Sequence, residues 1–391
     1  MRNGLDISGV SEFVQEIGEK PVEAVIDFHA CAVPGFSGAE VSIRTAHHGT
    51  QRMARSFRIP FTEHSAHPFG GLSAYEAVVA ALGACVLITH VHGYSARGVT
   101  ITSLRVTVTA AVEVDADGWW VGGDSALHDV RYLIEADCAG SVDSVREVSQ
   151  FVTCFSPNHR AFLDEGGYRL AAMAVRPDGT PDVVELDQVD PAPAGGDGTR
   201  LDLTAELCWE YGTEAGLMTT FSPGGELRRE RPRLVADQSK QMLGLDRGPN
   251  PQELLLAAIS ADLTHQVRHV AAERGITLAG LEVESSGRLD IRGMLNVSPD
   301  IPARFHNIRF LVRTDTEAAP TDFADVVRQA AARNVMLAAL LRPGAVQVDL
   351  RSPAGPLSSF RSDADQVAAF LAEMARKQAA MAGNAAHNLQ R

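Results

Sequence analysis

The sequence lacks several features that would place the protein in familiar functional classes. No run of 18 uninterrupted apolar residues occurs, so we expect no membrane-spanning helix. The first residues contain no basic segment followed by an apolar core, so we expect no secretory signal. The 35 lysine and arginine residues are outnumbered by 49 aspartate and glutamate residues, and the net charge of −14 argues against nucleic acid or a membrane surface as a partner.

Cysteine is scarce, with five residues in a chain of 391 and no CxxC pair. An odd number of scattered cysteines does not fit a disulfide framework and suits a reducing compartment, so we expect a cytoplasmic protein. No glycine-rich nucleotide loop and no regularly spaced metal ligands are present, so we expect no cofactor and no metal. The hydrophobic content of 45% and charged content of 21% are typical of globular proteins, and the length suffices for two domains.

An internal repeat organises the chain, at a shift of about 177 residues. Gly71–Ala81 aligns with Gly248–Ala258, and each run opens an apolar helix. Each helix ends before a glycine, Gly98 or Gly275, where a left-handed cap residue is wanted. The match continues to the end of each copy at about the same shift. We therefore predict a tandem duplication.

Each copy is expected to contain strands, a long helix, a strand hairpin, a second helix and a last strand. Strands grouped around two helices indicate an α+β fold with antiparallel sheets around long central helices. The second helices are expected at about Ser144–Cys154 and Asp322–Leu341, and the terminal helices, at Ser11–Ile17 and Asp363–Met381, are expected to pack on the pair or to cover the site. The predicted organisation is an N-terminal helical extension at 1–20, a first unit at 21–186, a linker at 187–199, a second unit at 200–353 and a C-terminal helical extension at 354–391.

The phrase Gly-Pro-Asn-Pro-Gln-Glu-Leu-Leu-Leu-Ala-Ala at Gly248–Ala258, with its diverged twin at Gly71–Ala81, resembles the OsmC/Ohr (osmotically inducible protein C / organic hydroperoxide resistance) family. The resemblance covers nearly the whole chain, once per copy. It implies intertwined α+β units that reduce peroxides with a thiolate at the interface between units. A fused duplicate is then expected to fold as an internal pseudo-dimer, which could assemble further as a homo-oligomer.

The resemblance assigns the reactive cysteine to one copy. Cys85 lies at the family's cysteine position, fourteen residues after the motif glycine, whereas the second copy has Asp262 there. The family's glutamate is replaced by Tyr75 in the first copy and by Gln252 in the second. The second copy is therefore degenerate at this position, and Cys85 is the expected thiolate nucleophile.

The family's resolving cysteine is also replaced, by Ser156 in the first copy and by Asn334 in the second. Cys154 lies two residues before Ser156, about 200° away around a regular helix, and is a doubtful substitute. The family's arginine has three candidate equivalents, which are Arg44, Arg55 and Arg58.

These replacements favour stabilising an anionic oxygen over cycling a disulfide. Tyr75 and Ser156 supply hydroxyl donors, and His159 is the expected base because its helix carries the family's second cysteine. His92 shares a helical face with Cys85 about 10 Å away, so we expect it to contact the substrate.

The leading hypothesis is a cysteine-nucleophile hydrolase that cleaves a small apolar carbonyl substrate, of the ester or β-diketone type, at the interface between units. The first strand of the second copy, with Trp209 and Glu210, is expected to line its pocket. One alternative is a thiol-dependent organic hydroperoxide reductase (peroxidase) resolved by an external thiol. The other is a non-catalytic ligand-binding scaffold.

Overall fold

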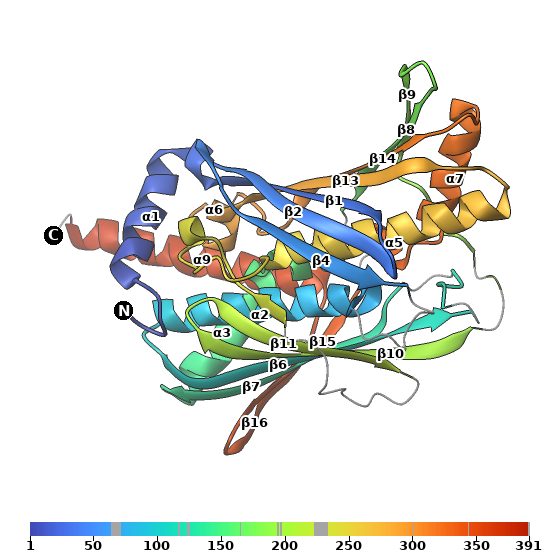
Figure 1. Cartoon of the computed structure of the whole chain (residues 1–391). Helices are drawn as coiled ribbons and strands as arrows, with labels where there is room; N and C mark the ends of the chain where they lie inside the picture. Colours follow the sequence, from blue (N-terminus) through green and yellow to red (C-terminus); the bar gives the residue numbers. More distant parts are fainter. Residues whose placement is uncertain are drawn as a thin grey trace.

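The computed structural model describes residues 1–389 apart from 64–71, 116–117, 123–125, 165, 194, 196–197, 223–233, 299 and 343. Two twisted sheets enclose two long helices, α2 and α5, that lie between them (Figure 1). The fold is α+β, as predicted.

The two halves of the chain present their main elements in the same order. The first half contains α1 (Ile7–Glu19), a 3-10 turn (Pro21–Ala24), β1 (Val25–Pro34), β2 (Gly38–His48), β3 (Gln51–Arg52), β4 (Ser56–Thr62), β5 (Leu72–Ser73), α2 (Ala74–Ala96), β6 (Thr100–Val114), β7 (His128–Ala139), α3 (Val142–Phe155), α4 (Pro157–Leu163), β8 (Tyr168–Val175) and β9 (Pro181–Asp187). The second half contains β10 (Thr199–Tyr211), β11 (Glu214–Ser222), β12 (Leu234–Ala236), a 3-10 turn (Lys240–Met242), α5 (Pro251–Glu273), β13 (Ala279–Asp290), α6 (Ile291–Met294), β14 (His306–Asp315), α7 (Pro320–Ala332), α8 (Val335–Leu341), β15 (Val346–Ser352), β16 (Gly355–Ser362) and α9 (Ala364–Leu389).

Each sheet is built from strands of both halves. One sheet has the order β5-β4-β2-β1-β13-β14-β8-β9, with β3 beside β2, and the other has the order β12-β11-β10-β6-β7-β15-β16. Strand β1 pairs antiparallel with β13, and β10 pairs antiparallel with β6, so each half continues a sheet begun by the other. The pairs β14–β8 and β15–β7 are parallel, a departure from the predicted antiparallel sheets. The strands of the two halves are therefore interleaved in both sheets.

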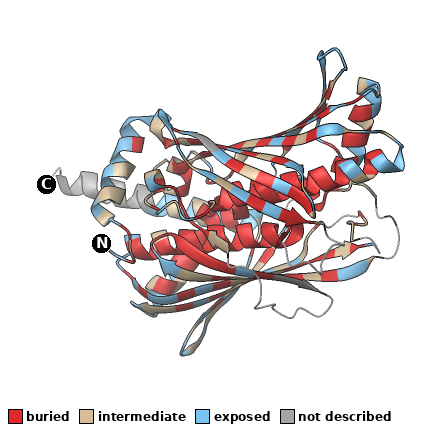
Figure 2. Cartoon of the chain, in the orientation of Figure 1, coloured by how far each residue is buried: buried red, intermediate tan, exposed pale blue. Residues whose placement is uncertain are grey.

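The core lies between the sheets, on the two long helices (Figure 2). Helix α2 packs on β6 and β10, whereas α5 packs on β1, β2 and β13, and the two helices contact each other. Each helix begins with a capping box, formed by Ser73 with Glu76 and by Asn250 with Glu253. Helix α2 is long and apolar enough to suit a membrane span by length and composition, but its most apolar 18-residue window is entirely buried within the protein.

Several local predictions can be compared with the observed elements. Gly98 and Gly275 have φ values of +77° and +67°, so both occupy the left-handed conformation expected after the long helices. The second helix of the second half is not continuous, because it breaks at Asn334 into α7 and α8. The C-terminal extension is not wholly helical either. Residues 355–362 form β16, which pairs with β15 and widens the second sheet.

Candidate functional site

Cys85 lies in the middle of α2 and is only 3% exposed. Its sulfur faces the start of α4 and the start of α5. The backbone N–H of Asn158 donates to the sulfur at 3.4 Å, and the side-chain amide of Gln252 donates to it at 3.5 Å. Asn158 belongs to the first half and Gln252 to the second, so both halves contribute hydrogen bonds to the sulfur.

The local sequence explains why the start of α4 offers free donors. Ser156 is extended, with φ −91° and ψ 109°, and separates α3 from α4. Pro157 occupies the first helical position, where its missing N–H costs nothing. The next N–H groups, of Asn158 and His159, have no partner one turn earlier in the helix and can therefore point at the sulfur.

Burial and hydrogen bonding have opposite effects on the Cys85 thiol. Removal from water raises the pKa of Cys85 above its ordinary value. The hydroxyl of Ser156, the N–H of Asn158, the amide of Gln252 and the N–H of His159 act to lower that pKa. The resting side chain is accordingly a neutral thiol, with donors already in place for a negatively charged sulfur.

A cavity of about 110 Å³ opens beside the sulfur at the seam between the halves. Its wall is largely apolar. The described residues that line it are Cys85, Ile88, Thr89, His92, Gly93, Ala96, Phe151 and Pro157 from the first half and Gln238, Gln252, Met294 and Leu295 from the second half. An engineered cavity of about 150 Å³ holds benzene, so this one matches a small branched alkyl group.

His159 does not occupy the place expected of a base. Its Nδ1 atom lies 3.1 Å from the hydroxyl of Tyr132, and its Nε2 atom lies 3.0 Å from the hydroxyl of Ser362. Burial lowers the pKa of His159 to about 3, so the ring is neutral, and its two nitrogens are engaged by the hydroxyls of Tyr132 and Ser362. Among the described residues no hydrogen bond joins this imidazole to Cys85, and the backbone N–H of His159 is the group that acts to lower the pKa of Cys85.

Tyr75, expected beside Cys85 as a hydroxyl donor, lies near the start of α2 instead. It is ten residues before Cys85 in α2, or about 15 Å along the helix axis. Burial raises the pKa of Tyr75 well above its ordinary value, and the negative charge of Asp262 raises it further. Tyr75 therefore belongs to the surroundings of Asp262 in the other half, and Gln252 takes the corresponding place beside Cys85.

Two other expected residues do lie near the sulfur. Ser156 is fully buried at the start of α4, and its hydroxyl lowers the pKa of Cys85. His92 lines the cavity, and its Nε2 atom has no hydrogen-bond partner among the described residues. Burial lowers the pKa of His92 to about 4, so it enters the cavity wall as a neutral ring.

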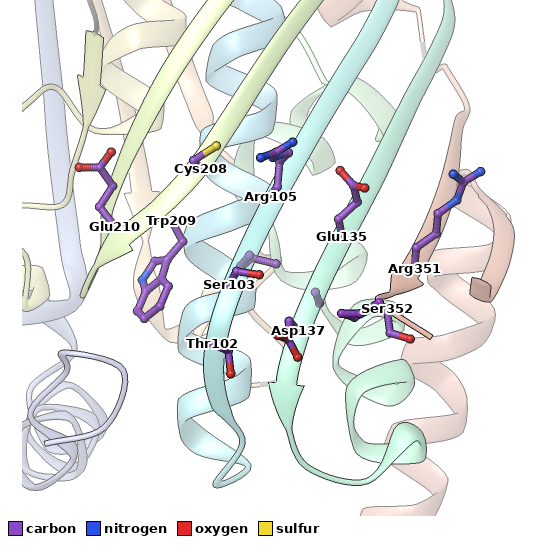
Figure 3. A pocket seen from close by; sticks show the side chains of 13 residues that line it. Thr102, Ser103, Arg105, Glu135, Asp137, Cys208, Trp209, Glu210, Arg351 and Ser352 are labelled. Carbon is purple, nitrogen blue, oxygen red and sulfur yellow. The ribbon is translucent and has the colours of Figure 1, made fainter. Parts of the chain in front are cut away.

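Trp209 and Glu210 are not part of this cavity. Both line a separate, open hollow of about 490 Å³ over β6, β7 and β10, together with Arg105 and Arg351 (Figure 3). The second half reaches the cavity through other segments, namely Gln238 two residues after β12, the start of α5 and the end of α6. The described lining of the cavity beside Cys85 therefore includes no residue of β10.

The three candidate arginines can also be placed. Arg55 forms ion pairs with Asp246 and Glu253 at 2.8 and 2.7 Å, at the start of α5. Arg58 is 74% exposed and pairs with Glu40, and Arg44 is exposed on β2. Among the described residues that line the cavity there is no arginine.

Sequence reasoning missed the two groups that hold the sulfur most directly. Gln252 was recognised as the counterpart of the family's glutamate, but it was assigned to its own copy. Asn158 carried no signal in the sequence, since its contact with the sulfur is a backbone N–H that any residue except proline supplies. Across the described residues, no group of three or more histidine, cysteine, aspartate or glutamate side chains is arranged to hold a metal ion.

The buried histidines predict an acid-sensitive fold. His90 is fully buried, with Nδ1 2.8 Å from the carbonyl of Val86 and Nε2 3.1 Å from the hydroxyl of Ser149. Burial lowers its pKa to about 4, below the ordinary value near 6.5, so the unfolded chain takes up the proton first as the pH falls. The contribution of the neutral His90 ring to the free energy of unfolding is complete above about pH 6.5 and is lost as the pH falls from about 6.5 to 4.

We expect His90 alone to account for about 2 kcal/mol of lost unfolding free energy between pH 7.5 and pH 5. Urea unfolding at the two pH values measures this loss. His90→Gln, whose amide can replace both hydrogen bonds without titrating, should show a smaller loss. An equal loss in the variant and the natural chain would contradict the prediction.

Comparison with known proteins identifies a family match in the second half of the chain. A family model described as OsmC-like protein matches residues 244–351. Among solved structures, an OsmC like protein from Mycoplasma pneumoniae is similar at 21% identity over 34% of this chain and 83% of that chain, with a TM-score of 0.26. No curated protein matches the chain significantly. The second half of this protein contains an OsmC-like domain, so the resemblance stated from the sequence is confirmed there.

Proposed function

We propose that this protein is a thiol-dependent reductase of small, apolar organic hydroperoxides, with Cys85 as the reacting thiol and an external thiol as the reductant. The observation that carries the proposal is the sulfur itself, which lies beside a largely apolar cavity and faces several hydrogen-bond donors. The OsmC-like domain of the second half, whose family includes thiol peroxidases, supports the same reaction class.

The reaction balances in atoms and protons. The thiol of Cys85 loses its proton, the thiolate attacks the outer oxygen of a hydroperoxide, the O–O bond breaks, and a proton returns to the leaving alkoxide to give an alcohol. Cys85 is then a sulfenic acid. A first external thiol converts the sulfenic acid into a mixed disulfide and water, and a second one releases Cys85 and a disulfide.

The geometry gives less support to the hydrolase hypothesis. Covalent hydrolysis needs a base to activate the nucleophile and then water. The imidazole of His159 is engaged by Tyr132 and Ser362, and Tyr75 lies at the far end of α2. Peroxide reduction also needs the thiolate of Cys85, but it needs no base to activate water afterwards.

An external thiol is required because the described structure offers no resolving partner beside Cys85. Ser156 stands where the family's second cysteine would be, and the Cys154 thiol points toward the carbonyl of Gln150 at 3.8 Å. All five cysteines are free thiols, which suits the reducing cytoplasm that we propose as the location. We also infer that the matching order of elements in the two halves reflects a tandem duplication.

Trapping of the sulfenic acid tests the proposal. The purified protein is treated with one equivalent of tert-butyl hydroperoxide in the presence of dimedone, and the modified peptide is located by mass spectrometry. We expect dimedone on Cys85, and more slowly or not at all on Cys31, whose pKa is raised to about 12 by burial and by Glu282. Labelling that spares Cys85 would refute the proposed function.

A further inference from the structure

The side chain of Asn158 joins three helices around the reactive sulfur. Its Nδ2 atom donates to the carbonyl of Ala81 in α2 at 3.1 Å and to the carbonyl of Pro251 in α5 at 2.8 Å. An amide nitrogen has two hydrogens, and both are used by these carbonyls. The Oδ1 atom is left, and it can only accept a hydrogen bond. Because Asn158 is fully buried, water cannot relieve a mismatch at that oxygen.

Gln252 satisfies this acceptor. Its Nε2 atom lies 3.2 Å from Oδ1 of Asn158 and 3.5 Å from the sulfur of Cys85. A flipped amide would place Oε1 against Oδ1, two acceptors facing each other in a buried site. Asn158 therefore determines that Gln252 presents its amide nitrogen, rather than its oxygen, to the sulfur.

We propose that Gln252, supplied by the half without a reactive cysteine, is a catalytic residue that donates a hydrogen bond to the reacting sulfur, and that Asn158 is the positioning residue that orients it. This role of Gln252 rests on the proposed function, because both take the sulfur of Cys85 as the reacting atom. It extends that function by assigning one half the nucleophile and the other half the donor that stabilises its anionic form.

Of the two positions related by the sequence repeat, Gln252 and Tyr75, only Gln252 faces a thiol. Gln252 and Tyr75 correspond by the sequence repeat, yet Tyr75 faces the surroundings of Asp262 rather than a thiol. A glutamate in place of Gln252 would present oxygens to both Oδ1 of Asn158 and the sulfur. A glutamine is the residue of that length that can serve both acceptors at once.

Alkylation of Cys85 by iodoacetamide, followed by mass spectrometry across a pH series, measures the ionisation of the thiol without any hydroperoxide. We expect Gln252→Met to shift the profile upward by about one pH unit, which makes alkylation at pH 8 about tenfold slower. Gln266→Met is the matched control, because Gln266 is a buried glutamine of the same helix that bonds to the carbonyl of Arg333 instead. We expect its profile to equal that of the natural chain.

A double-variant comparison tests the positioning role. Asn158→Ser should slow alkylation in the natural background but add little in the Gln252→Met background, because Asn158 acts through Gln252. Fully additive effects would overturn the positioning role, and an unchanged profile in Gln252→Met would overturn the catalytic role of Gln252.

If Asn158→Ser does not fold by circular dichroism, Gln252→Glu decides the question. We expect slower alkylation in Gln252→Glu than in Gln252→Met, since an acceptor replaces the donor. An equal or faster rate would overturn the proposal. A shifted alkylation profile in a protein that reduces no hydroperoxide would show that the proposed function fails while the donor arrangement stands.

Discussion

A loss of tert-butyl hydroperoxide turnover of at least about a thousandfold is the expected result of Cys85→Ser. The serine hydroxyl is close in size to the thiol and can accept hydrogen bonds from the same donors. It is, however, a far weaker nucleophile than sulfur and does not form a sulfenic acid. Steady-state consumption of hydroperoxide with dithiothreitol as the reductant measures the change.

Two other cysteine variants serve as controls for this experiment. Cys154→Ser removes the thiol nearest in sequence to the family's resolving position, and Cys31→Ser removes a thiol on β1 that donates to Glu282 on the neighbouring strand β13. We expect both to keep activity within about twofold. Residual turnover in Cys85→Ser, or a comparable loss in Cys154→Ser, would contradict a mechanism that uses Cys85 with an external thiol.

The second large effect is expected from Arg55→Met, which should lower the free energy of unfolding by about 3–5 kcal/mol. Arg55 is 5% exposed and donates to Glu253, whose side chain is fully buried, and to the carbonyl of Gly248. Removing the guanidinium leaves the carboxylate of Glu253 buried without its cation. Chemical denaturation at pH 7 measures the loss.

Two comparisons separate this cause from a general effect of losing an arginine. Arg58→Met removes an ion pair with Glu40 that is largely exposed, with the arginine 74% accessible, so we expect a loss of less than about 1 kcal/mol. Arg55→Met combined with Glu253→Gln should be more stable than Arg55→Met alone, because no uncompensated charge remains. A double variant less stable than the single one would contradict the explanation.

The overall architecture could be predicted because it depends on local patterns that recur twice. Two apolar helices ended by Gly98 and Gly275, each followed by alternating strands, are visible in the amino-acid order. The last strand of the second half could not be predicted from the sequence. Residues 355–362, which form β16, show no apolar alternation in the sequence, since Leu357 and Phe360 are three positions apart, and they were included in the predicted helical extension.

The candidate site could be predicted only in part, because it is assembled from both halves. Cys85 was found through a family resemblance, but its neighbours depend on which helix ends meet in space. Sequence spacing places Tyr75 and Cys85 on one helix, and it gives no indication that Gln252 crosses from the other half. The backbone N–H of Asn158 is a property of how α4 begins, and any residue except proline would supply it.

The sharing of both sheets has a consequence for how this chain can be divided. Translation of only the first 190 or so residues would yield β1 and β6 with the edges that β13 and β10 normally cover left open. Open edges of this kind template aggregation. Because each half covers strand edges of the other, we expect a chain of only the first 190 or so residues to aggregate rather than to remain a stable monomer.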